Sequence, residues 1–562
     1  MITKWRLLVY NPNMHSSKKT LFFLGLIIVL AAFFRLWDLK SVPPGLYPDE
    51  AMNGNNALYA LESGNFSSFY SQNNGREGLF INIQAFAIKT FGNEPWTLRM
   101  ISGFFGIFTV LGVFFLGREL FRGLKGGGRK IFGFEPEEII GLGAAFFMAV
   151  SFWHINFSRI GFRAVMAPFF IVWALYFLLV SFREEISAKF QIFTSLAGGF
   201  FLGLGAHSYI AYRLAPFLIL PAAFRFLRNK RNAAIFLLFI LAAFIAFLPL
   251  GIYFLKNPSD FLGRTSQISV FSSKEPLKAF ALNLVKTAGS FWFEGDYNPR
   301  HNFPGAPQLW PPVGVFLAVG LVAGIFKRGM PIYLLWLWLV LFSLPVVFSA
   351  EGLPHALRSI LLLPPLLIFA AFGFWKILDC VRERFEAKAA LFPAKERQVG
   401  RIRLEWSLLV ALFLAAHIIT VYSDYFVRWA NTPEVYFAFN GNYARMGRWL
   451  NRQDKSTPKY VIINSSGVLA EIPDAPSVRP LPMPSQTIMF LTDSWSAQNQ
   501  KEKNINYLLP EEIGQADCPN SCLIFALEPD PNLNAKIKET FKDLKVSIEP
   551  GFAVFYKNAV LR

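Results

Sequence analysis

Residues 21–52 read LFFLGLIIVLAAFFRLWDLKSVPPGLYPDEAM, an apolar run followed by a short acidic segment rich in proline. The run 21–37 has the composition of a transmembrane helix, which needs roughly 20 mostly apolar residues. It is preceded by four basic residues, which are Lys4, Arg6, Lys18 and Lys19. No small-residue cleavage site follows it. Because basic residues remain on the cytoplasmic side, we expect a retained first span with the N-terminal segment 1–20 in the cytoplasm.

The composition of the whole chain agrees with a membrane protein. Of its 562 residues 54% are apolar, 62 are Phe, and only 16% are charged, against about 25% in ordinary soluble proteins. These values exclude a disordered chain, which needs low hydrophobicity and high charge. The net charge of +18 comes from 55 Lys and Arg against 37 Asp and Glu. In an apolar chain, this excess is explained by basic residues in the cytoplasmic loops of a membrane protein. We therefore expect no nucleic-acid partner.

Further apolar stretches predict ten more spans. They lie at about 97–117, 139–155, 163–181, 191–207, 209–224, 233–254, 311–326, 331–348, 356–377 and 406–423. The stretch 78–91 is short and contains Asn82, Gln84 and Lys89. If it does not cross, every basic cluster between spans falls on the cytoplasmic side, so we place it on the outer face as a re-entrant or interfacial helix. The predicted fold class is a mainly α, polytopic membrane protein with about eleven spans.

This topology leaves three long segments outside the cytoplasm: a first loop at 38–96, a second at 255–310, and a C-terminal tail at 424–562. The tail has four short β-rich runs, at 460–464, 487–491, 523–527 and 552–556, and helix-compatible stretches at 434–452 and 534–544. We therefore expect a transmembrane domain over 21–423 and a small extracytoplasmic α/β domain over 424–562. Cys518 and Cys522 form either a local disulfide or two free thiols.

The first loop carries the adjacent carboxylates Asp49 and Glu50 directly after Pro48. One interpretation is structural, because proline and acidic residues suit the first turn of a helix. The other is catalytic, because a partly desolvated carboxylate at the membrane surface could act as a general base toward an acceptor hydroxyl. Composition alone does not separate the two.

Other polar residues are predicted to lie near the outer membrane surface, as Asp49 and Glu50 are. They are Arg76, Glu77, Arg163, Tyr209, Arg213, His301, His355 and Arg358. Each alone is explained as an interfacial side chain that extends toward water. Together they predict cations and carboxylates around one outer cavity, where charge at membrane depth indicates function. Arginine suits phosphate, because its guanidinium makes bidentate hydrogen bonds.

An ordered series of segments over about 20–425 resembles a known family. The segments are 46–51 (LYPDEA), 75–80 (GREGLF), 97–99 (TLR), 103–106 (GFFG), 158–168, 209–216 and 355–358 (HALR). This series is similar to membrane glycosyltransferases of the GT-C fold, of the family 39 type, whose relatives include protein O-mannosyltransferases and bacterial aminoarabinose transferases.

The resemblance implies inverting transfer of a sugar from a polyprenyl-phosphate donor to a protein, lipid or glycan acceptor on the extracytoplasmic face of the cell membrane. It implies that Asp49 is the base and that Glu50 orients it. It also implies that basic residues bind the donor phosphate, first Arg76 and Arg358, then Arg213 and Arg163. Many relatives carry Lys-Pro-Pro or His-Pro-Pro where this chain has Arg76-Glu77-Gly78, which leaves the phosphate contacts open.

No cofactor is expected. A divalent metal held by Glu77 and a histidine such as His301 stays open, and His355 and Tyr209 are further candidates for substrate or metal contact. The alternative function is a flippase or transporter for a lipid-linked sugar, although the few carboxylates within the spans give ion-coupled transport weak support. A third interpretation is a membrane anchor whose outer domain binds a partner.

Overall fold

The computed structural model describes residues 17–124, 130–226, 229–261, 275–349, 352–391, 396–471 and 479–561. Predictions for residues 1–16 and for 262–274 of the second loop therefore lie outside the described residues. The chain divides into two compact units. Unit 1 contains Met1–Trp37, Ser102–Arg159 and Arg163–Trp429, and unit 2 contains Asp38–Ile101, Ile160–Phe162 and Ala430–Arg562.

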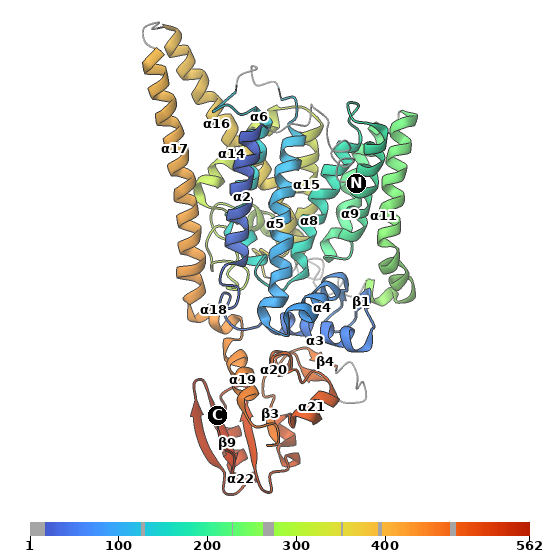
Figure 1. Ribbon diagram of the computed structural model, residues 1–562, viewed down its shortest axis with the longest axis vertical. Helices are drawn as coiled ribbons and strands as arrows, with labels where there is room; N and C mark the ends of the chain where they lie inside the picture. Colours follow the sequence, from blue (N-terminus) through green and yellow to red (C-terminus); the bar gives the residue numbers. More distant parts are fainter. Residues whose placement is uncertain are drawn as a thin grey trace. The chain divides into compact units, whose positions relative to one another are not determined.

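Unit 1 is helical, and most of its helices coincide with the predicted apolar stretches (Figure 1), whereas the helix Pro276–Gly289 lies within the loop predicted at 255–310. They are α2 (Lys18–Leu36), α5 (Pro95–Leu120, which begins in unit 2), α6 (Pro136–Ala149), α7 (Phe152–Phe157), α8 (Met166–Ser181), α9 (Ala188–Gly205), α10 (Ala215–Phe226), α11 (Lys230–Lys256), α13 (Pro276–Gly289), α14 (Pro311–Phe326), α15 (Met330–Val347), α16 (Leu363–Leu391) and α17 (Glu396–Tyr422).

Among the described residues, seven helical segments are long and apolar enough to cross a membrane. They are Lys18–Leu36, Pro95–Leu120, Arg163–Ser181, Lys230–Lys256, Met330–Val347, Ile360–Arg384 and Glu405–Asn431. The stretches predicted at 139–155, 191–207, 209–224 and 311–326 also form helices, which are shorter or less apolar. The mainly α, polytopic fold is thus confirmed.

Glycines allow close helix packing in unit 1. A Cβ added to Gly320 of α14 would lie 1.9 Å from the Phe369 carbonyl oxygen of α16, and one added to Gly373 of α16 would lie 1.9 Å from the Phe316 carbonyl oxygen of α14. In lipid, van der Waals packing of this kind replaces the hydrophobic effect between helices. The two backbones therefore meet at positions that only glycine can occupy.

Unit 2 joins the first loop to the C-terminal tail. The loop forms α3 (Pro48–Ser63), α4 (Leu79–Phe91) and the paired strands β1 (Phe69–Tyr70) and β2 (Arg76–Glu77). Its apolar side chains share one core with Phe490 and Trp495 of the tail. A Cβ on Gly54 of α3 would lie 2.2 Å from the Phe490 ring, and Thr487 donates a hydrogen bond to the Leu46 carbonyl oxygen at 3.0 Å. The location of α4 at the membrane surface stays a prediction.

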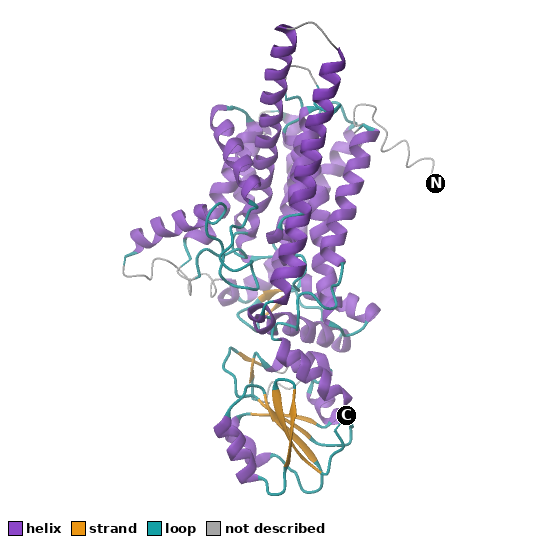
Figure 2. Ribbon diagram, turned by 90° about the vertical axis from the view of Figure 1, so that its left-hand side faces the viewer, coloured by secondary structure: helices purple, strands orange, loops and turns teal. Residues whose placement is uncertain are grey.

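The tail contains a five-stranded mixed sheet in the order β6-β3-β7-β9-β8 (Figure 2). The strands are β3 (Lys459–Ile462), β6 (Ile505–Leu508), β7 (Cys522–Ala526), β8 (Lys545–Glu549) and β9 (Phe552–Lys557). β3 runs parallel to both β6 and β7, whereas β9 pairs antiparallel with β7 and β8. Alternate residues face opposite sides, so Val461 joins the core beneath α19 (Gly441–Arg452) and Ile462 joins the core beneath α22 (Pro531–Thr540).

The remaining short elements of the tail are α18 (Pro433–Ala438), β4 (Leu469–Ala470), β5 (Leu481–Pro482), α20 (Ser485–Thr492) and α21 (Ala497–Lys503). The strand predicted at 487–491 is wrong, because these residues lie within α20. Their run Thr-Ile-Met-Phe-Leu is apolar apart from Thr487, and such a short run has no period that distinguishes a buried helix from a strand. The predictions at 460–464, 523–527 and 552–556 are confirmed as β3, β7 and β9. Cys518 and Cys522 form a disulfide.

Candidate functional site

Asp49 and Glu50 occupy the first turn of α3, and they have different environments. Glu50 is fully buried. Its carboxylate accepts hydrogen bonds from Arg99 Nε at 2.9 Å, Arg99 Nη2 at 3.2 Å and the Gly161 amide at 2.8 Å. Asp49 is only partly buried, and its Oδ1 accepts a hydrogen bond from Asn73 Nδ2 at 2.6 Å. The structural interpretation thus fits Glu50, and Asp49 has the more accessible carboxylate.

Arg99 is the residue that fixes this corner. Besides Glu50 it binds the carbonyl oxygens of Pro43 at 2.6 Å and Gly45 at 2.9 Å. Its guanidinium therefore ties the segment before α3 to the first turn of α3. The sequence contains a signal for it in the TLR motif at 97–99, but Arg99 was not among the predicted site residues.

Arg76 extends the same polar network on the other side of α3. It is buried and donates hydrogen bonds to Asn53 Oδ1 at 2.7 Å and to Asn56 Oδ1. Asn53 Nδ2 in turn donates to the Gly161 carbonyl oxygen at 3.0 Å. The network therefore runs from Arg76 through Asn53 and Gly161 to Glu50. Glu77, next to Arg76 in β2, is also buried.

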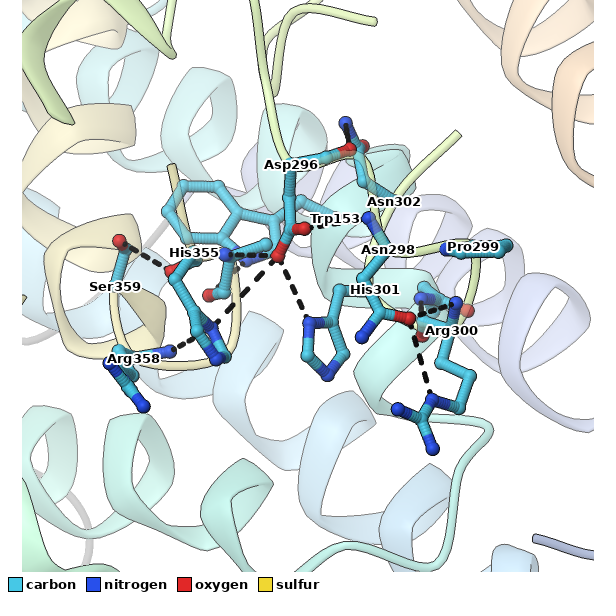
Figure 3. A network of polar contacts seen from close by, with 12 residues as sticks. Trp153, Asp296, Asn298, Pro299, Arg300, His301, Asn302, His355, Arg358 and Ser359 are labelled. Atoms are coloured by element: carbon cyan, nitrogen blue, oxygen red, sulfur yellow. Dashed lines mark hydrogen bonds and ion pairs between the residues drawn. The ribbon is translucent and has the colours of Figure 1, made fainter. Parts of the chain in front are cut away.

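A second polar cluster lies within unit 1, in the loop before α14 and the loop before α16 (Figure 3). Asp296 is its centre. Its Oδ2 is 3.0 Å from His301 Nδ1, 2.8 Å from the Ala356 amide nitrogen and 3.9 Å from His355 Nδ1. Its Oδ1 accepts a hydrogen bond from the Asn298 amide at 2.8 Å. One carboxylate thus links two loops that are distant in sequence.

Electrostatics set the charge states in this cluster. Burial raises the pKa of Asp296, but hydrogen bonds and the charge of His301 outweigh it, so that the net pKa lies below its ordinary value. Burial lowers the pKa of His355, and the charges of His301 and Arg358 lower it further. Asp296 is therefore a carboxylate and His355 a neutral imidazole near neutral pH.

Three residues that the sequence predicts as site residues lie together in this cluster: His301, His355 and Arg358. Arg358 is partly buried and donates a hydrogen bond to Ser349 Oγ, while its backbone amide is 3.4 Å from His355 Nδ1. The rings of His301 and His355 have centroids 4.9 Å apart. Asp296, which holds them, was missed, because its partners come from loops that only the fold brings together.

Other predicted residues lie elsewhere. Arg213 donates a hydrogen bond to the Phe261 carbonyl oxygen at 2.7 Å, and its guanidinium lies over the rings of Phe254 and Phe261. Tyr209 directly precedes the 3₁₀ turn Ile210–Leu214 that contains Arg213. Arg163 begins another 3₁₀ turn, before α8. Asp49, Glu50, Arg76 and Glu77 belong to unit 2, and the other predicted residues belong to unit 1.

Among the described residues, one group offers the ligand atoms for a metal ion. Suitable atoms of Asp296, His301 and His355 all lie within 4.8 Å of one another. Imidazole nitrogens with a carboxylate oxygen match the donor set of zinc sites with three protein ligands. The group therefore fits a divalent ion, although its carboxylate is already used by amide donors. It does not contain Glu77, whose pairing with a histidine such as His301 was left open.

The chain is similar to ArnT from Cupriavidus metallidurans bound to undecaprenyl phosphate, with a TM-score of 0.54 at 11% identity over 96% of this chain and 98% of that chain. The chain has the GT-C fold. It is also similar to the archaeal oligosaccharyltransferase AglB from Archaeoglobus fulgidus, in complex with an inhibitory peptide and a dolichol-phosphate. That match has a TM-score of 0.50 at 14% identity, over 90% of this chain and 69% of that chain.

No family model matches the chain, and no curated protein matches it in sequence. The GT-C fold together with the apolar helices identifies an integral membrane protein. The expected fold is confirmed, whereas the roles of the individual residues stay predictions.

Proposed function

We propose that this GT-C protein is a glycosyltransferase that moves a sugar from a polyprenyl-phosphate donor to a hydroxyl group of a protein, lipid or glycan acceptor. The observation that carries the proposal is the contrast within the pair of carboxylates. Glu50 is buried and saturated by hydrogen bonds, whereas Asp49 is partly exposed and held by one amide. A fold similar to that of an enzyme bound to undecaprenyl phosphate supports the donor class.

In the proposed reaction Asp49 accepts the proton of the acceptor hydroxyl. The acceptor oxygen forms a bond to the anomeric carbon of the sugar, and the bond from that carbon to the phosphate oxygen breaks on the opposite face. The configuration is therefore inverted, and the electron pair leaves with polyprenyl phosphate. Because phosphate is already a good leaving group, cations suffice to stabilise the developing charge.

Glu50 and Arg99 are positioning residues in this proposal. Their ion pair holds the first turn of α3, and with it the backbone that carries Asp49. Arg76 supports the following turn of α3 through Asn53. It remains a candidate for the phosphate, together with Arg213 and Arg163, but Arg358 is the first choice. Arg358 is only partly buried, and its guanidinium suits bidentate hydrogen bonds to phosphate.

The proposed steps use side chains alone, without a cofactor. Asp296, His301 and His355 are the residues that would hold a divalent ion, whose chemistry there would be stabilisation of negative charge. Tyr209 and Glu77 stay candidates for substrate contact. We place the protein in the cell membrane with the N-terminus in the cytoplasm and with the site and the tail outside, as the basic clusters predict.

The test uses the full chain in phosphatidylcholine nanodiscs with radiolabelled polyprenyl-phosphate sugars and a cell-envelope extract as the acceptor source. Asp49→Asn abolishes transfer and leaves the melting temperature unchanged, because asparagine keeps the shape and the contact with Asn73. Asp38→Asn is the matched control, since Asp38 is exposed in the same loop and has a φ of 48°, which asparagine tolerates. Full transfer by Asp49→Asn would exclude Asp49 as the base.

The alternative is a flippase or transporter for a lipid-linked sugar. It predicts that labelled donor crosses the bilayer of a reconstituted vesicle with no new glycosidic bond. Mass spectrometry of the acceptor fraction distinguishes the two functions, because only transfer adds the mass of a sugar.

A further inference from the structure

A pocket of unit 1 that plays no part in the proposed transfer has a volume of about 220 Å³, many times what a single water molecule requires. It lies among α6, α7, the loop before α14, α16 and the end of α17. Aromatic side chains form much of its wall: Phe147, Phe152, Phe303 and Trp310.

Two buried polar side chains line this pocket without a protein partner for some of their polar atoms. Gln308 is 3% exposed, and among the described residues neither its Oε1 nor its Nε2 has a hydrogen-bond partner. His417 is 2% exposed, and its Nδ1 likewise has none. Buried polar groups are almost always hydrogen-bonded in folded proteins. Three such atoms at one pocket therefore indicate a polar occupant.

The backbone at Gln308 and the ring of His417 are held in place. The backbone amide of Gln308 donates a hydrogen bond to the Ser290 carbonyl oxygen at 2.9 Å, and this bond fixes the backbone at this position. The His417 ring stacks on Trp310 with centroids 4.2 Å apart. The backbone of Gln308 and the ring of His417 are thus in place before a ligand arrives.

The charge of the lining restricts the ligand. Apart from His417, its ionisable residues are Asp424 and Arg428, which form an ion pair with each other at 2.7 Å. Both lie on the π-helical turn Ser423–Arg428 that follows α17, and π-helical turns are frequent at functional sites. A phosphate monoester dianion would meet the Asp424 carboxylate and, without an O–H group, would give Gln308 Oε1 no donor. A hydrocarbon would satisfy none of the three polar atoms.

We propose that this pocket binds a single sugar ring as a neutral, hydroxyl-rich ligand. Each hydroxyl both donates and accepts, so adjacent hydroxyls can pair with Gln308 Oε1, Gln308 Nε2 and His417 Nδ1. The aromatic wall packs against the C–H faces of the ring. The inference does not depend on Asp49 or on transfer, and the source of the ring is either a free sugar or the head group of a membrane glycolipid.

The experiment measures binding without donor or turnover. Full-length protein in phosphatidylcholine nanodiscs is titrated with methyl glycosides of common hexoses and pentoses, and then with octyl glycosides of the same sugars. The readouts are saturation-transfer NMR, with empty nanodiscs as the background, and the shift in melting temperature. We expect at least one sugar to bind; preference for the octyl form indicates a glycolipid, and equal binding of both forms a free sugar.

Gln308→Leu removes both amide atoms at nearly constant volume, and Gln498→Leu on exposed α21 is the matched control. Gln308→Leu weakens sugar binding at least tenfold, whereas Gln498→Leu binds as the wild type does. Without sugar, Gln308→Leu melts no lower than wild type, because it removes an unsatisfied polar group; this shows that the variant folds. Binding of no glycoside, or equal binding by both variants, overturns the proposal, as does stronger binding of methyl phosphate than of any sugar.

Discussion

Glu50→Gln removes the negative charge that faces Arg99 and leaves the shape of the side chain almost unchanged. Both residues are at most 1% exposed, so the arginine then stays buried without a counter-charge. Removal of one partner of a buried ion pair costs about 3–5 kcal/mol. Because about 1.4 kcal/mol corresponds to a factor of ten, the first turn of α3 should open at least about 100-fold more often.

Hydrogen exchange measured by mass spectrometry tests this magnitude directly. The Gly161 amide donates to Glu50 at 2.8 Å, so peptides that cover 160–162 and the first turn of α3 report the opening. Glu94→Gln is the matched control, because Glu94 is exposed in the same loop. Unchanged protection in Glu50→Gln would refute the reasoning, since it would mean that the charge of Arg99 is balanced by a group other than Glu50.

Three further predictions concern packing, pH and metal. Gly320→Val destabilises unit 1 by about 1–3 kcal/mol or more, because its Cβ would lie 1.9 Å from the Phe369 carbonyl oxygen; thermal unfolding against Gly25→Val, where a Cβ meets no atom within 4 Å, measures it. Burial lowers the pKa of Lys459 to about 8 from an ordinary 10.5, so the unfolded chain binds more protons between these values and stability rises with pH across that window. Lys459→Met should lose this rise in urea unfolding. Dialysis against a chelator leaves sugar transfer unchanged, and a loss restored by zinc would instead assign a catalytic metal.

The sequence predicts the helices well, because each apolar stretch carries its signal locally. Short buried elements are harder. The sequence predicts a strand at 487–491, although this run forms part of α20, because a helix buried on all sides has no amphipathic period. The strand β8 was missed, since its residues Lys545–Glu549 are mostly exposed and it pairs only at the edge of the sheet.

In the candidate site, too, the sequence predicts what has a local signal and misses what depends on distant parts of the chain. Asp49 and Glu50 are conspicuous in a chain with few charges, but their difference in burial depends on Arg99 and Gly161, which lie about 50 and 111 residues away. Asp296 gave no signal, because its partners include a backbone amide 60 residues later in the chain. Gln308 looks like any loop glutamine until the walls of the pocket are known.

The shared core of the first loop and α20 has a consequence for biogenesis. Asn55 of α3 binds Gln486, which is 431 residues later in the sequence, and Phe490 covers Gly54. At about 5–20 residues per second, a ribosome needs about 20–90 s to synthesise the intervening chain. During this interval the remaining membrane helices are made, but the apolar face of α3 has no cover from α20. A chain that terminates before residue 485 thus retains every predicted span but leaves the apolar surface of the first loop exposed to the proteases and chaperones of its compartment.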